Sequence, residues 1–124
     1  MNTPANLLYT KDHEWVKVEG KQVVVGITDY AQSQLGDIVF VDIQTEGVYL
    51  DAGDEFGAVE AVKTVADLLM PLSGTVIQVN PELEGAPQLV NTDPYGEGWM
   101  VKIEVSNPEE LTGLLKAEIY SATL

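Results

Sequence analysis

The residue in this sequence that is best suited to covalent chemistry is Lys63, which lies between two apolar runs of similar length. Residues 56–62 and 65–70 are rich in small and β-branched side chains, so each run predicts a short strand. Pro71 cannot donate to a strand ladder and ends the second strand. The pattern predicts a hairpin with Lys63 exposed at its tip, although it lacks the Asn-Gly or Asp-Gly pair that marks the tightest hairpins.

An exposed lysine amine can be a plain surface charge or a point of covalent attachment. The nearby carboxylates of Glu60 and Asp67 favour the protonated amine, which is not a nucleophile. We therefore expect Lys63 to be acylated by a separate enzyme rather than to form a Schiff base itself. Its isolation supports a special role, because it is the only basic residue between Lys21 and Lys102.

Three further residues have side chains suited to ionic or acid–base chemistry. His13 is the only histidine and is predicted to lie in a strand beside Glu14, where a structural role is the simpler interpretation. Asp67 interrupts an apolar strand four residues after Lys63, and burying a charge without a partner is costly, so its presence asks for a reason. With one histidine and no cysteine, the sequence predicts neither a metal site nor a cysteine nucleophile.

Length, composition and charge exclude several classes of function. The 124 residues are 45% hydrophobic and 21% charged, which predicts a single globular domain over residues 1–124 with its own core. The net charge of −14 disfavours nucleic acid binding and suits partners with basic surfaces. No apolar run approaches the ~20 residues of a membrane span, and the N-terminus resembles neither a signal nor a transit peptide. We expect a cytoplasmic protein, or a mitochondrial matrix protein if a transit peptide has been removed.

Period-two alternation and turn residues predict a mainly antiparallel β protein around the hairpin. The other expected strands cover residues 7–9, 14–18, 22–25, 37–43, 47–50, 75–79 and 99–105. The strand at 37–43 is apolar almost throughout, so we expect it to be buried on both faces. Residues 80–98 are rich in proline and glycine and are expected to form an ordered but irregular loop.

Helix signals occur in two places. Thr28 is a good N-cap and Gly36 a good stop, which predicts a short helix near residues 28–35. Asn107 and Pro108 are a cap and a first helical residue, which predicts C-terminal helices near 108–121. The expected buried stripe of these C-terminal helices is Leu111, Leu114 and Leu115.

Several segments resemble, in the same order, the signatures of the glycine cleavage system H protein family. These are residues 9–16 (YTKDHEWV), 25–32 (VGITDYAQ), 35–41 (LGDIVFV), 59–63 (VEAVK), 71–74 (PLSG), 91–99 (NTDPYGEGW) and 102–103 (KI). Ala61 and Thr64 depart from the family's usual Ser and Ala, but both remain small. The resemblance covers nearly the whole chain and implies the barrel-sandwich hybrid fold that lipoyl and biotinyl carriers share.

The resemblance also implies a function, which is that of a non-catalytic carrier with lipoate in amide linkage on Lys63. The implied hairpin flanks of the attachment site are Glu60, Ala61, Val62 and Thr64. Glu14 and Asp67, with His13 beside them, are implied to line a cleft in which the aminomethyl-loaded arm docks. Carboxylates suit that cargo, because a cationic amine gains charge-assisted hydrogen bonds from them.

The implied partners are the enzymes that load, unload, reoxidise and attach the arm. They are the PLP-dependent glycine decarboxylase (P protein), the tetrahydrofolate-dependent aminomethyltransferase (T protein), dihydrolipoyl dehydrogenase (L protein), and a lipoate ligase or octanoyltransferase. Neither nucleic acid nor membrane is an expected partner.

Alternatives to this carrier remain at the level of sequence. A lipoyl relay protein would donate lipoate to other 2-oxoacid dehydrogenase complexes, and a non-carrier interaction domain would leave Lys63 bare. A biotin carrier is disfavoured, because its lysine usually lies between methionines, whereas Val62 and Thr64 flank Lys63 here.

Overall fold

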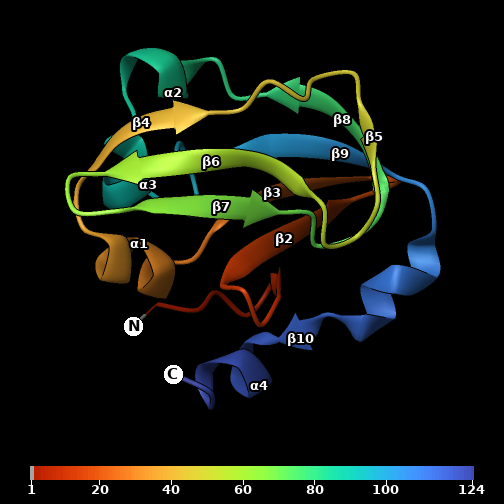
Figure 1. Cartoon of the computed structure of the whole chain (residues 1–124). Coiled ribbons are helices and arrows are strands. Elements are labelled where there is room, and N and C mark those ends of the chain that lie inside the picture. Colours follow the sequence, from red (N-terminus) through yellow and green to blue (C-terminus); the bar gives the residue numbers. More distant parts are fainter. Residues whose placement is uncertain (1) are drawn as a thin grey trace.

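A computed structural model describes residues 2–124 and contains two antiparallel sheets that face each other (Figure 1). The larger sheet has the spatial order β10 (Leu115–Lys116), β1 (Leu8–Tyr9), β2 (Glu14–Glu19), β3 (Gln22–Ile27), β9 (Val101–Val105), β8 (Gly74–Val79) and β5 (Tyr49–Leu50). The smaller sheet has the order β4 (Ile38–Asp42), β6 (Glu55–Ala61) and β7 (Val65–Leu69). The chain is therefore mainly β, as the sequence predicts.

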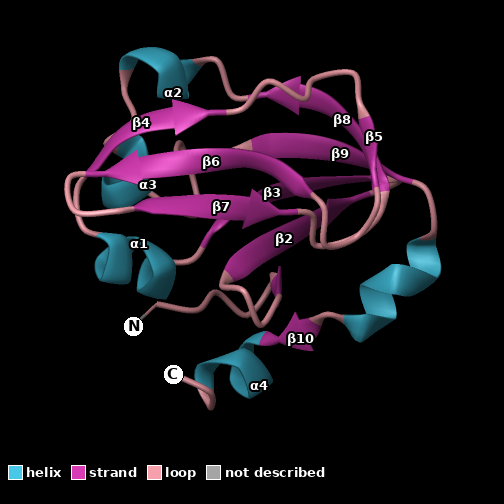
Figure 2. Ribbon diagram, viewed as in Figure 1, coloured by secondary structure: helices cyan, strands magenta, loops and turns pink. Residues whose placement is uncertain are grey.

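Short helical segments lie around the two sheets (Figure 2). They are α1 (Asp29–Leu35), α2 (Glu82–Gly85), α3 (Leu89–Thr92), the 3-10 helix η1 (Pro108–Gly113) and α4 (Ala117–Ser121). In Figure 1, α1 lies at the same end of the molecule as the turn between β6 and β7. No helix among residues 2–124 is both long enough and apolar enough to cross a membrane.

One hydrophobic core joins the inner faces of the two sheets. Val16, Val25 and Ile103 contribute from the larger sheet, while Phe56 and Val59 contribute from the smaller one, and all five are almost fully buried. Alternation along each strand places these side chains on one face. The two sheets are thus the layers of a sandwich that shares a single core.

A second cluster packs on the opposite face of the larger sheet and ties down the C-terminus. The ring of Tyr120 on α4 stacks on that of Tyr9 with centroids 4.7 Å apart. Trp15 is buried beside them and donates from Nε1 to the carbonyl oxygen of Pro94 at 2.9 Å. Residues from both ends of the chain therefore hold α4 against the sheet.

The prediction of a helix near 28–35 is confirmed, and its capping follows the sequence. Oγ1 of Thr28 accepts a hydrogen bond from the backbone N–H of Ala31 at 3.2 Å, and Gly36 ends the helix with a positive φ. Both signals are local, so the sequence alone contains them.

The strand expected at 37–43 is present as β4, but the expectation that both of its faces are buried is wrong. β4 is an edge strand of the smaller sheet, and Val39 and Phe40 are 52% and 45% exposed. Only Ile38 of this strand is buried. An apolar run predicts burial on both faces only where both faces have a covering layer, and here one does not.

Two other predicted segments are corrected. The region 80–98 contains the single helical turns α2 and α3, whose Leu83 and Val90 reach the core. The predicted C-terminal helices near 108–121 are a 3-10 helix and a short α-helix separated by β10. Gly113 ends the first, and pairing of Leu115 with Tyr9 of β1 imposes an extended backbone between them.

The expected buried stripe is also different from the one observed. The three predicted members, Leu111, Leu114 and Leu115, are only partly buried. Tyr120 is instead the fully buried side chain of the C-terminal segment. The predicted stripe requires one continuous helix, but the 3-10 helix ends at Gly113 and Leu115 lies in the strand β10, so the three leucines do not share a helix face.

Candidate functional site

The turn between β6 and β7 holds Lys63 clear of both sheets. Glu60 pairs with Val65 at the end of the ladder, and the N–H of Ala61 donates to the carbonyl oxygen of Thr64 at 2.7 Å. Lys63 is exposed, and Val62 beside it is 72% exposed. The structure therefore has the predicted hairpin, with the lysine amine on a closed turn.

The carboxylates that flank Lys63 in sequence do not form an ion pair with it. Among residues 2–124, the single ion pair within 4.0 Å joins Lys17 and Glu19. Glu60 and Asp67 are both exposed. Their influence on the amine is therefore that of solvent-screened neighbours.

A cleft of about 350 Å³ lies beside this hairpin and brings the three predicted ionic residues together. Glu14 and His13 come from the start of β2 and the turn before it, and Asp67 comes from β7. The remaining lining residues are Asp12, Ile27, Tyr30, Ala31, Gln34, Leu35, Val59, Ala66 and Leu68. One wall is thus α1, and the opposite wall is the outer strand of the smaller sheet.

Glu14 is the buried carboxyl of the cleft, with 3% of its surface exposed. Its Oε2 accepts from the backbone N–H of Leu69 at 2.9 Å, and its Oε1 accepts from the hydroxyl of Thr10 at 3.2 Å. The first bond satisfies a donor on the free edge of β7, which has no neighbouring strand. The fold therefore holds the carboxyl in one place.

Burial raises the pKa of Glu14 to about 7, because desolvation disfavours the charged form. The hydrogen bonds from Leu69 and Thr10 act in the opposite direction, and the charge of Asp12 raises the pKa further. This carboxyl consequently changes its charge near neutral pH. A cation entering the cleft would favour the ionised form and gain a charge-assisted hydrogen bond.

Asp67 lies on the exposed rim of the cleft rather than on its floor. It pairs with Ala58 across the ladder, and its side chain is exposed. The expected cost of a charge in an apolar strand is therefore absent, because the carboxylate stays in water. The Asp67 carboxylate raises the pKa of the exposed Glu55 above its usual value, because it can accept a hydrogen bond from protonated Glu55 and repels the ionised form.

His13 lies in the turn before β2, so its predicted place in a strand is wrong. Its φ is 66°, an uncommon backbone angle for a residue other than glycine. Its Nδ1 is 2.8 Å from the hydroxyl of Tyr120, which is itself 2.7 Å from Oγ1 of Thr28. Its ring packs against Tyr30 of α1 with centroids 4.7 Å apart.

The link between His13 and Tyr120 was not predicted from the sequence. The two residues are 107 positions apart, and no local signal connects them. Through Thr28, the same hydroxyl group reaches the cap of α1. The C-terminal segment therefore supports the wall of the cleft, which sequence reasoning did not detect.

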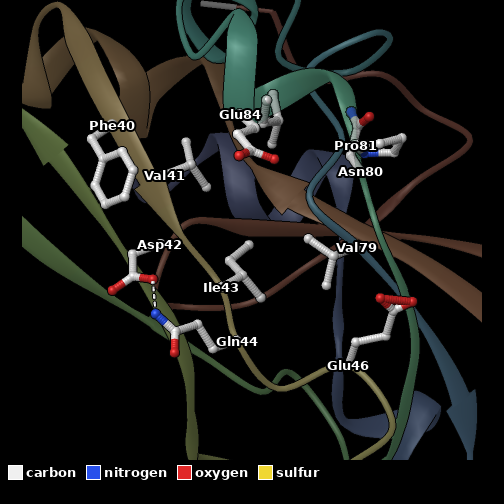
Figure 3. Close-up of a pocket in the computed structure, with 11 residues that line it drawn as sticks. Phe40, Val41, Asp42, Ile43, Gln44, Glu46, Val79, Asn80, Pro81 and Glu84 are labelled. Carbon is white, nitrogen blue, oxygen red and sulfur yellow. Dashed lines mark hydrogen bonds between the residues drawn. The ribbon is translucent and has the colours of Figure 1, made fainter.

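A second hollow of about 400 Å³ lies between β4 and the segment leading to α2 (Figure 3). It is lined by Phe40, Asp42 and Glu84, among others, and it includes none of the predicted site residues. Figure 3 shows the Gln44 side chain donating to Asp42 within this hollow. Among residues 2–124, no group of three or more His, Asp, Glu or Cys residues is placed to hold a metal ion.

The two sheets form a sandwich that does not close into a barrel, with a lysine exposed on a hairpin tip, and so define a protein of the barrel-sandwich class. The chain belongs to one family of that class, because the family model for glycine cleavage H-protein matches residues 7–124.

Relatives of known name agree with this assignment. The glycine cleavage system H protein of Bacteroides fragilis is 56% identical over 124 residues, which are 100% of this chain and 98% of the relative. That of Symbiobacterium thermophilum is 55% identical over 121 residues, covering 98% and 94%. A crystal structure of a glycine cleavage system H protein from Mycobacterium marinum matches with a TM-score of 0.85 and 38% identity, covering 97% of each chain. The predicted barrel-sandwich fold is thereby confirmed.

Proposed function

We propose that this chain, acting as a single domain over residues 1–124, carries lipoate in amide linkage on Lys63. It would shuttle the aminomethyl group of glycine from the decarboxylase to the tetrahydrofolate-dependent aminomethyltransferase. Dihydrolipoyl dehydrogenase would reoxidise the arm between cycles. The observation that carries this proposal is an exposed lysine on a closed hairpin tip beside a cleft with a buried carboxyl, in a chain of the H-protein family.

The residues at the hairpin tip fit covalent attachment of an acyl group. The Lys63 side chain is exposed, so an activated acyl donor held by a ligase or octanoyltransferase can reach it. Val62 and Thr64 are exposed on either side, while Ala61 is buried and fixes the turn to the sheet. Glu60, the last exposed residue of β6, offers that enzyme a charge at a defined distance from the tip. When attached, the lipoyl group would supply the dithiol that accepts and releases the cargo.

The residues of the cleft fit a small cationic amine. Glu14 would accept a charge-assisted hydrogen bond from the ammonium while keeping its bond to the N–H of Leu69. Asp67 on the rim would attract the cation at longer range. His13 would shape the wall through its contacts with Tyr30 and Tyr120, without touching the reacting atoms. The apolar lining would keep bulk water away from the group between enzymes.

The charge of the chain supports a carrier that meets several enzymes in turn. A net charge of −14 speeds encounter with basic docking faces and repels nucleic acid. The tether raises the effective concentration of the arm at each docked site, typically to millimolar for a short flexible link. The named relatives come from bacteria, and we place this chain in the same compartment as its enzymes, the cytoplasm of a bacterial cell.

Intact mass after expression with an active lipoate ligase and lipoate tests the proposal. We expect one lipoyl increment, located on Lys63 by digestion, and exchange of glycine carbon with CO2 when the modified chain is added to the decarboxylase. Modification without such exchange would favour the relay function instead. A chain that stays unmodified, while a control lipoyl domain is modified, would overturn the carrier proposal.

A further inference from the structure

The aliphatic stem of Lys63 lies against Gly36, the residue that follows α1. A Cβ at position 36 would lie 3.3 Å from Cε of Lys63 and 3.8 Å from its Nζ. Contacts of 3.3 Å between a Cβ and another carbon are shorter than ordinary van der Waals contact. A side chain at position 36 would therefore press against the lysine, whose stem would have to move by a few tenths of an ångström.

The backbone at Gly36 also excludes other residues. Its φ of 80° and ψ of −158° lie in a region that only glycine adopts without strain. Two features therefore act in the same direction at position 36: the backbone angles favour glycine, and a side chain there would push Cε of Lys63 away by a few tenths of an ångström. A positive φ does not by itself imply a close neighbour. Gly47 and Gly53 also have a positive φ, yet no atom lies within 4 Å of a Cβ placed at either position.

Three hydrogen bonds fix the corner that contains Gly36, and one of them reaches the hairpin tip. The side chain of Asn91 donates to the carbonyl oxygen of Gly36 at 2.8 Å and accepts from the N–H of Ile38 at 2.8 Å. The carbonyl oxygen of Asp37 accepts from the N–H of Val62 at 3.0 Å, next to the lysine itself. Hydrogen bonds therefore connect the corner to α3 through Asn91 and to the hairpin tip through Val62.

The position of this corner connects the attachment point to the cleft. Leu35 and Gln34, immediately before Gly36, line the cleft wall formed by α1. Figure 1 shows the hairpin tip and α1 at the same end of the molecule. A chain that starts at Lys63 and crosses Gly36 would therefore arrive at the cleft mouth.

We propose that Gly36 is the seat over which the acylated Lys63 arm passes from the hairpin tip into the cleft. The seat, defined as Gly36 with the corner held by Asn91, binds the aliphatic stem of the arm and sets its direction. This inference rests on the proposed function, since it concerns how the attached arm reaches its docked position. It assigns to Gly36 a positioning role, not contact with the cargo.

The test measures how well the docked arm is protected from a thiol reagent. The chain contains no cysteine, so the thiols of the reduced arm are the only thiols in the modified protein. One of them is converted with 2-bromoethylamine into a stable S-aminoethyl group, which stands in for the cationic cargo. The rate at which N-ethylmaleimide alkylates the other thiol then reports how exposed the loaded arm is.

The variants compared are wild type, Gly36→Ala and Gly47→Ala, each modified on Lys63 and verified by mass. Gly47 is the control for a substitution at a positive φ, because its φ is 85° and no atom lies within 4 Å of a Cβ placed there. We expect Gly36→Ala to be alkylated about tenfold faster than wild type, as overpacking of this size displaces the arm. Gly47→Ala should match wild type in alkylation.

The outcomes separate this inference from the proposed function. If loaded wild type is alkylated as fast as free dihydrolipoamide carrying the same group, the arm does not dock, and both the docking proposal and the seat are wrong. If wild type and Gly36→Ala are equally protected, the arm docks without using Gly36, and only the seat is wrong. If Gly47→Ala loses protection as well, backbone strain explains the effect and the seat is again wrong.

A second measurement uses only the wild-type protein, so its result does not depend on whether a variant folds. In wild-type protein labelled with 15N, the amide resonance of Gly36 should shift when the S-aminoethyl group is added to the arm. That of Gly47 should not shift. An unchanged Gly36 resonance in an arm that is protected from alkylation would overturn the seat.

Discussion

The hairpin tip and the cleft floor each hold one side chain that the proposed function needs, and the two side chains differ in burial and in hydrogen bonding. Lys63 is exposed on a turn between two strands and forms no ion pair within 4.0 Å among the described residues. Glu14 is buried, is fixed by bonds to Leu69 and Thr10, and has a pKa raised to about 7. One group is exposed to a modifying enzyme, and the other is buried and fixed by hydrogen bonds.

This difference shows how a small protein can divide a transfer function between two regions. A group that must visit several enzymes benefits from an exposed, solvated attachment point, which gives the tether its reach. A group that must recognise a cation benefits from desolvation, which strengthens each electrostatic contact. The cost of burying Glu14 is limited by the N–H at the edge of β7, which needed an acceptor in any case.

The largest expected effect comes from removing the attachment point. Lys63→Arg keeps the charge at an exposed position, so the free energy of unfolding should stay within about 0.5 kcal/mol of wild type. Modification by lipoate should disappear entirely, and glycine exchange with it. Intact mass and an exchange assay measure both, and a lipoyl increment on the variant would show that the attachment site has been misplaced.

The next effect comes from the cleft floor. Glu14→Gln keeps the shape but removes the carboxylate, and a hydrogen bond to a charged group contributes about 1.5–3 kcal/mol. The S-aminoethyl arm should therefore be alkylated at least roughly tenfold faster than in wild type. Glu118→Gln is the control, because Glu118 is exposed on α4 and lies outside the cleft. Equal protection in wild type and Glu14→Gln would exclude Glu14 as the partner of the cation.

The same substitution should change how stability depends on pH. A carboxyl whose pKa rises from 4.5 to about 7 on folding favours the folded state while protonated, and this contribution is lost as pH rises through about 7. Going from pH 4 to 8, wild type should lose up to roughly 3 kcal/mol relative to Glu14→Gln. Urea unfolding at several pH values measures this. Parallel pH profiles for the two proteins would contradict the raised pKa.

A smaller effect is expected at the rim. Asp67→Asn removes an exposed charge, and exposed pairs contribute about 0.2–1 kcal/mol, so protection of the loaded arm should fall by less than roughly fivefold. The pKa of Glu55 should also fall, because the carboxyl that raises it is gone. NMR titration of Glu55 follows the second change. An effect larger than that of Glu14→Gln would reverse the assignment of floor and rim.

The smallest effect is expected beside the lysine. Thr64→Ala leaves the backbone bond from Ala61 to residue 64 intact and removes an exposed hydroxyl whose hydrogen bond to the carbonyl of Val65 is 3.5 Å long. Stability should change by less than about 0.5 kcal/mol, and the rate of modification should stay within roughly twofold of wild type. A time course of lipoylation measures this, and a large loss would mean that the hydroxyl of Thr64 is recognised directly.

Some features of the cleft were predictable and some were not, as Asp67 and His13 illustrate. Both were expected at the cleft, and the structure does bring them to it with Glu14. Their environments differ from expectation: Asp67 is solvated, and His13 lies in a turn with a positive φ. Solvation and backbone angle depend on neighbours from other segments, such as α1 and Tyr120, which local sequence does not contain.

β4 and the C-terminal segment show the same limit for the fold. The strand and the final helix were expected, but the exposure of Val39 and Phe40 and the insertion of β10 were not. The sequence of an apolar run shows that the strand is hydrophobic, whereas its burial depends on whether another layer covers each of its faces. Pairing of Leu115 with β1 likewise depends on a strand more than a hundred residues away.

The sequence by itself determined the hairpin around Lys63, the capped helix α1, the alternation of the strands and the family, because each is encoded in neighbouring residues or in ordered motifs. Only the tertiary structure decided which carboxyl is buried, which is exposed, and that the stem of Lys63 lies over Gly36. These properties arise from contacts between distant segments, and desolvation and steric exclusion exist only once those segments are packed together.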